Sequence, residues 1–196
     1  MTAVTDQPEP ANSAGGHSAD GAVLIIGAGL IGTSLGLALR QAGRTVYLSD
    51  RQTEIAVAAA TLGAGTVYPA QPMPDPAELE ADPAGLGPDS GESAAAPSPI
   101  ELVVVAVQPD QVAAEVAAAL LRFPDATVTD VSSVKGSVLA ELIERGSDIR
   151  RYVGSHPMAG SQRSGPLAAR ADLFRDRTWV IAIHEHEDYA RTALVE

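Results

Sequence analysis

The stretch from Ala22 to Gly43, AVLIIGAGLIGTSLGLALRQAG, constrains the fold more than any other part of the chain. It opens with a short apolar run rich in β-branched residues that ends at Ile26. Glycines follow in the pattern G-A-G-L-I-G, and apolar residues then recur at roughly helical spacing until Gly43. This pattern predicts a buried strand, a tight turn and a helix, in that order.

The glycines of this turn have the spacing of a phosphate-binding loop. In such a loop the first glycine, Gly27, permits the tight turn, and the second, Gly29, lets the backbone approach a pyrophosphate. The third, Gly32, permits close packing of helix against strand. Leu30 and Ile31 stand at the start of the helix, whose N-terminus favours an anion. We therefore predict that these five residues contact a dinucleotide.

An acid and a base follow the next predicted strand, about 20 residues further on. Asp50 would accept hydrogen bonds from a ribose 2'-hydroxyl and would repel a 2'-phosphate, which favours NAD over NADP. Arg51 argues in the other direction, because its guanidinium could hold that phosphate. The alternative to the whole interpretation is a strand-to-helix turn that binds no ligand.

Strands and helices alternate along the rest of the chain. Apolar runs typical of strands alternate with amphipathic or glycine-terminated segments, which predicts an α/β fold of the Rossmann type, with a doubly wound and mainly parallel sheet over residues 22–196. The expected strands are 45–50, 100–110, 126–132, 151–157 and 178–183, the expected helices are 52–65, 111–121 and 135–146, and another helix is expected to begin near 187.

Two segments do not fit this alternation. Residues 1–21 are rich in Ala, Gly, Ser, Pro and Asp without periodicity, and we expect a disordered tail. Residues 69–99 are crowded with Pro, Gly, Ala and Ser and carry six acids and no Lys or Arg, which predicts a flexible acidic insertion. This insertion supplies half of the net charge of −12. A docking segment for a basic partner is the alternative to a solvated loop.

Composition excludes several classes of function. Thirteen basic residues against 25 acids argue against nucleic acid as a partner. The absence of cysteine excludes disulfides, Cys-ligated metals and thiol catalysis, and we predict no metal. No run approaches the roughly 18 apolar residues of a membrane span, and the N-terminus lacks the pattern of a secretory signal. We therefore expect a cytoplasmic protein that does not bind membranes.

Polar residues at two later strand ends are candidates for chemistry. His156, in GSHPMAG, lies at the end of a predicted strand, and an imidazole has a suitable pKa to take a hydroxyl proton, although His156 could also be a loop histidine bonded to backbone. Ser132 and Ser133 could cap the following helix or bind a substrate hydroxyl. Lys135, the only lysine, could hold a carboxylate or face solvent. His184 is expected to be a solvated loop histidine, as is His186.

Three segments together resemble the prephenate/arogenate dehydrogenase family of tyrosine biosynthesis. They are GAGLIGTSLGLAL, DVSSVKG and GSHPMAGSQRSGPLAARADLFRDRTWVI, they occur in the family's order, and they cover most of residues 22–183. The resemblance implies NAD-dependent oxidation of prephenate with loss of carbon dioxide, giving 4-hydroxyphenylpyruvate. It implies that His156 accepts the proton of the ring C4 hydroxyl and that Ser133 orients that hydroxyl. Ser161 and Gln162 lie where the family meets the substrate side chain.

The chain also departs from the family pattern. Members have a helical second domain that forms the dimer and lends basic residues for the substrate carboxylates, and this chain ends before such a domain. We therefore expect a cofactor domain with half an active site, poor at turnover, and a homodimer for a full-length form. The acidic insertion and Gln108 are further departures. The alternatives are an arogenate dehydrogenase, a related hydroxy-acid or imine reductase, and a non-catalytic NAD-binding module.

Overall fold

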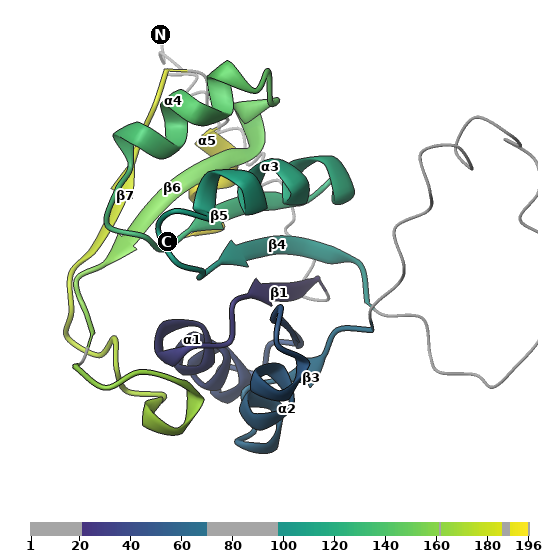
Figure 1. Ribbon diagram of the computed structural model, residues 1–196, viewed down its shortest axis with the longest axis vertical. Coiled ribbons are helices and arrows are strands. Elements are labelled where there is room, and N and C mark those ends of the chain that lie inside the picture. The colour runs from purple at the N-terminus through teal and green to yellow at the C-terminus, as the bar shows by residue number, and fades with distance from the viewer. Residues whose placement is uncertain (1–20, 70–97, 161, 186–188, 196) are drawn as a thin grey trace, which may run out of the picture.

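The computed structural model describes residues 21–69, 98–160, 162–185 and 189–195 (Figure 1). The strands are β1 (Ala22–Ile26), β2 (Val46–Ser49), β3 (Thr66–Val67), β4 (Ile100–Val105), β5 (Thr127–Asp130), β6 (Tyr152–Pro157) and β7 (Trp179–Ala182). The α-helices are α1 (Leu30–Gln41), α2 (Thr53–Thr61), α3 (Val112–Arg122), α4 (Gly136–Glu144) and α5 (Tyr189–Thr192), and short 3-10 helices cover Ile149–Arg151 and Pro166–Ala168.

The strands form one seven-stranded sheet in the order β3-β2-β1-β4-β5-β6-β7. All neighbouring pairs are parallel except β6 and β7, which are antiparallel. The order reverses between β1 and β4, where a doubly wound sheet opens a crevice at the carboxyl ends of its strands. This confirms the predicted Rossmann-type fold with a mainly parallel sheet.

Helices cover both faces of the sheet, with α1 and α2 on one side and α3 and α4 on the other (Figure 1). Side chains of a strand alternate between the two faces, so a strand covered on both sides is apolar throughout. In β4, Val103 and Val105 pack in the core beneath α3 and α4, whereas Leu102 and Val104 pack in the core beneath α1 and α2. The valine run of β4 therefore follows from its central place in the sheet.

The predicted elements are present with bounds that differ by a few residues. Strand β3 was not predicted, because it has only two residues, Thr66 and Val67, and is held by pairing with β2. The predicted tail and nearly all of the predicted insertion lie outside the described residues. Among the described helices, none is long and apolar enough to cross a membrane.

Candidate active site

The glycine-rich turn between β1 and α1 has the geometry that its sequence predicts. Gly27 has a φ of +98°, and a Cβ atom there would lie 2.5 Å from the Ala106 carbonyl oxygen. A Cβ atom at Gly32 would overlap the Gly27 carbonyl oxygen. At Gly29 a Cβ atom would meet nothing within 4 Å. Two of the glycines are thus required by backbone packing, and the middle one faces open space.

Asp50 holds this turn in place from the end of β2. Its Oδ2 accepts a hydrogen bond from the Ala28 amide at 2.9 Å, and its Oδ1 accepts one from the Gln52 amide at 3.0 Å. Each carboxylate oxygen can accept more than one hydrogen bond, so capacity for a ligand hydroxyl remains. Asp50 therefore joins the glycine turn to the start of α2 while it lines the crevice.

A cavity of about 470 Å³ lies beside the turn. Its lining includes Gly27, Gly29, Asp50 and Arg51 from the first half of the fold, and it also includes residues of the β4–α3 connection and of the later segment around Gly165. Leu30 is buried and Ile31 packs against the core, so at these positions only the backbone can serve a ligand. Open space at Gly29, the N-terminus of α1 and an acid at the end of β2 fit a dinucleotide.

His156 lies inside β6, which agrees with the predicted strand 151–157, and not in a loop after that strand. β7 pairs with β6 up to Pro157, with His156 opposite Val180, and this pairing extends the strand through residues of low strand propensity. The half-buried imidazole places Nδ1 3.5 Å from the Val131 carbonyl oxygen. A carbonyl can only accept a hydrogen bond, so this contact favours a proton on Nδ1 and leaves the Nε2 lone pair to accept a proton.

A second cavity, of about 350 Å³, opens beside His156. Arg170 and Arg177 line it together with His156, Met158 and Leu173, and none of the described residues that line it is acidic. The Arg170 guanidinium lies 3.5 Å from the exposed carboxylate of Asp172. The arginines were missed in the sequence, because they lie 14 and 21 residues after the histidine in a segment without regular periodicity. The cavity combines an imidazole with positive charge.

The serines before Lys135 do not cap α4. Ser132 is half-buried and its hydroxyl donates to the Val134 carbonyl oxygen at 3.2 Å, whereas Ser133 is exposed. The N-cap position of α4 is Lys135, and no side chain caps this helix. The connection between β5 and α4 thus presents Ser133 to solvent at the same edge of the sheet as the end of β6.

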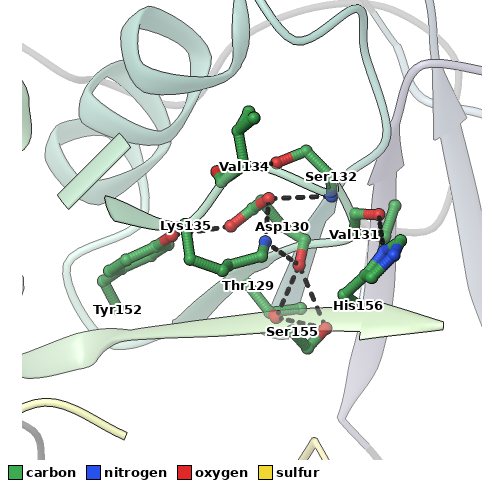
Figure 2. A network of polar contacts seen from close by, with 9 residues as sticks. All are labelled: Thr129, Asp130, Val131, Ser132, Val134, Lys135, Tyr152, Ser155 and His156. Carbon is green, nitrogen blue, oxygen red and sulfur yellow. Dashed lines mark hydrogen bonds and ion pairs between the residues drawn. The ribbon is translucent and has the colours of Figure 1, made fainter. Parts of the chain in front are cut away.

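Asp130, at the end of β5, is the centre of a buried polar network that the sequence pattern does not predict (Figure 2). It is fully buried, forms an ion pair with the Lys135 ammonium, and accepts hydrogen bonds from the Tyr152 hydroxyl at 2.6 Å and the Ser132 amide at 2.9 Å. Burial lowers the pKa of Lys135, with Asp130 acting in the opposite direction. Burial, together with the charge of Asp130, raises the pKa of Tyr152. Lys135 is thus already paired with a carboxylate of the protein.

Other candidates are less informative. Gln162 is exposed, and Ser161 lies outside the described residues. His184 is not the solvated histidine that was expected: its Nε2 lies 3.0 Å from the Tyr152 carbonyl oxygen and its ring stacks on that of Tyr152. His186 lies outside the described residues. Within the described part of the chain, no three His, Asp or Glu side chains gather as a metal site would require.

Comparisons with known proteins identify the family of the chain. The family model described as "Prephenate dehydrogenase, nucleotide-binding domain" matches residues 74–196. A probable prephenate dehydrogenase of Streptomyces niveus, NovF, is 38% identical over 158 residues, which are 81% of this chain and 36% of that protein.

Solved structures have the same fold. The crystal structure of the prephenate dehydrogenase from Aquifex aeolicus in complex with hydroxyphenyl propionate and NAD+ has a TM-score of 0.69 at 25% identity, over 92% of this chain and 56% of that one. The Synechocystis arogenate dehydrogenase has a TM-score of 0.66 at 22% identity, over 88% of this chain and 54% of that one. The chain thus spans about a third to a half of the length of the proteins it matches.

Proposed function

The chain belongs to the prephenate dehydrogenase family, and from this premise we propose that it binds NAD and serves the oxidative decarboxylation of prephenate to 4-hydroxyphenylpyruvate. The observation that carries the proposal is the joint position of the dinucleotide-like crevice and His156. β1 and β6 run in the same direction within the sheet, so the glycine turn and the histidine lie at the same edge.

The cofactor would be held by residues of the first half of the fold. The backbone of Gly27, Gly29 and the first turn of α1 would bind the pyrophosphate, with Leu30, Ile31 and Gly32 contributing through the backbone. Asp50 would bind a ribose hydroxyl, which favours NAD, and Arg51 borders the same cavity. When bound, NAD supplies the hydride acceptor that the oxidation requires.

The chain's own residues would handle the proton and the charge. His156 accepts the proton of the ring C4 hydroxyl at Nε2, and Ser133 orients that hydroxyl. The hydroxyl carbon gives up a hydride to the cofactor and becomes a carbonyl. The ring carboxylate then leaves as carbon dioxide, and its electron pair completes the aromatic ring as the carbonyl oxygen takes up a proton to become the phenol. Arg170 and Arg177 beside His156 suit a substrate that carries carboxylates.

Prephenate is proposed as the substrate, and arogenate is the alternative. The two differ in the side chain, which ends in a keto acid in prephenate and an amino acid in arogenate. Gln162, with Ser161 beside it in the sequence, is uncharged and so favours neither by charge. Comparison of turnover with the two compounds under identical conditions decides between them.

A full-length form is proposed to be a homodimer.

The experiment that tests the function separates cofactor binding from proton transfer. Calorimetric titration with NAD and NADP is expected to show tighter binding of NAD. A separate assay then measures the NADH that an active form produces when prephenate is added. His156→Asn should leave the affinity for NAD unchanged and lower turnover by about 10²- to 10⁴-fold. Turnover retained by this variant would refute the role of His156, and failure of the wild-type chain to bind NAD would refute the cofactor site.

A further inference from the structure

We propose that Asp130 is a positioning residue that holds the connection 131–135 so that the Val131 carbonyl selects the reactive tautomer of His156. Nothing in the family resemblance assigned a role to this acid. The proposal rests on the function proposed above only in taking His156 as the proton acceptor. It concerns residues of this chain alone.

The Asp130 carboxylate has enough partners to act as a fixed anchor. Oδ1 receives the Ser132 amide at 2.9 Å and the Lys135 ammonium, and Oδ2 receives the Tyr152 hydroxyl at 2.6 Å (Figure 2). A fully buried carboxylate needs such partners, and here they come from both ends of the connection and from β6. Its oxygens face these donors, so it serves to hold structure and not to exchange protons with a ligand.

This anchor reaches His156 by two routes. Val131 stands between Asp130 and Ser132, so fixing the Ser132 amide on Oδ1 also fixes the peptide that carries the Val131 carbonyl. That carbonyl is the group 3.5 Å from Nδ1 of His156. In addition, the Asp130 carbonyl oxygen accepts the Ser155 hydroxyl at 3.0 Å, and Ser155 directly precedes His156 in β6.

The tautomer determines which nitrogen of His156 can act. A neutral imidazole free in water prefers its proton on Nε2, and in that form Nε2 cannot accept another proton. A carbonyl held against Nδ1 requires the proton on Nδ1 and leaves the Nε2 lone pair free. Release of the Val131 carbonyl would therefore return His156 to the tautomer that is unsuited to its role.

The test reads the tautomer directly, without turnover. Nitrogen-15 NMR of histidine-labelled chain at a pH above the histidine titration distinguishes the two ring nitrogens, and His156→Asn identifies the signals. The wild type is expected to carry its proton on Nδ1 of His156. Asp130→Asn is expected to move most of the population to Nε2–H and to speed hydrogen exchange of the Ser132 amide by at least about tenfold.

A matched control separates positioning from a general loss of stability. Thr127→Val alters a buried polar residue of the same strand, whose hydroxyl faces Arg191 and not the connection 131–135. It should leave the tautomer and the Ser132 exchange as in the wild type. If Asp130→Asn does not fold, Tyr152→Phe, which keeps the carboxylate and removes one donor, should show the same changes to a smaller extent.

Each outcome decides the proposal. A wild-type His156 with its proton on Nε2 would overturn it, and so would an unchanged tautomer in a folded Asp130→Asn chain or, failing that, in Tyr152→Phe. An equal change in Thr127→Val would assign the effect to loss of stability. Neither measurement needs NAD or turnover. A chain that does not bind NAD would therefore refute the proposed function and leave this inference standing.

Discussion

At the scale of single residues, two glycines of the same turn should respond in opposite ways to the same substitution. Gly29→Ala adds a Cβ atom into open space at a φ of −73°, so the free energy of unfolding should change by less than about 0.5 kcal/mol. The methyl group would stand where a pyrophosphate must approach, so the affinity for NAD should fall by at least about tenfold.

Gly32→Ala is the matched counterpart. Its Cβ atom would overlap the Gly27 carbonyl oxygen, and relief requires movement of backbone, so a loss of about 1–3 kcal/mol of stability is expected. Urea unfolding and NAD calorimetry on both variants check the pair. Equal stabilities of the two variants would contradict the packing role of Gly32.

Arg177 should act on an anionic substrate and leave the cofactor alone. It lines the cavity beside His156, and its loss removes a charge-assisted contact to a carboxylate. Arg177→Met should weaken binding of hydroxyphenyl propionate by about tenfold with NAD affinity unchanged. Arg150→Met is the control, because Arg150 is paired with Asp148 in the 3-10 helix before β6, at the other end of that strand. Equal losses in both variants would point to long-range charge and away from this cavity.

Tyr152 should make the fold sensitive to alkaline pH. Its pKa is raised in the folded chain by burial and by Asp130, so above about pH 10 the unfolded chain releases a proton that the folded chain keeps. The stability linked to this group is present below pH 10 and falls by about 1.4 kcal/mol for each pH unit above it. Tyr152→Phe removes this slope, and urea unfolding of both chains from pH 8 to pH 11 measures it. Parallel curves would contradict the raised pKa.

At the scale of elements, the sequence predicted those whose residues carry their own pattern. The valine run of β4 could be predicted because burial on both faces requires apolar residues throughout the strand. The glycine turn before α1 could be predicted because its backbone geometry requires glycine. β3 depends on pairing with β2, and a strand of two residues leaves no local signal. The start of α4 is another case, since the serines that could have capped it do not, and Lys135 pairs with Asp130.

The site residues, too, divide into those that the local sequence predicts and those that it does not. The spacing of the glycines, with a strand before them and an acid about 20 residues on, predicts a dinucleotide crevice, and the position of His156 at a strand end marks it as a candidate. Asp130 is the first residue of the segment DVSSVKG, but the sequence does not predict its role. A single acid at a strand end does not indicate that Tyr152 and Lys135 will both bind it in the fold. Convergence of residues 22 positions apart is a property of the sheet and not of either segment.

At the scale of the whole molecule, the crevice is built from parts that are distant in the chain. Its lining joins the glycine turn, the end of β2, the connection after β4 and the segment at Ser164 and Gly165. A ligand bound there contacts both halves of the sheet. Binding should therefore stabilise the domain as one unit and not only the glycine turn.

The linkage between binding and folding gives the size of this stabilisation, and Trp179 provides a probe for it. NAD at about 100 times its dissociation constant should add about 2.7 kcal/mol to the free energy of unfolding. Trp179, the only tryptophan, lies on β7 at the far edge of the sheet and packs against Phe174, so its fluorescence reports on that edge. When NAD is added, the unfolding midpoint followed by Trp179 fluorescence should rise together with the midpoint followed by far-ultraviolet circular dichroism. If the Trp179 midpoint stayed fixed, β7 would unfold separately from the cofactor crevice.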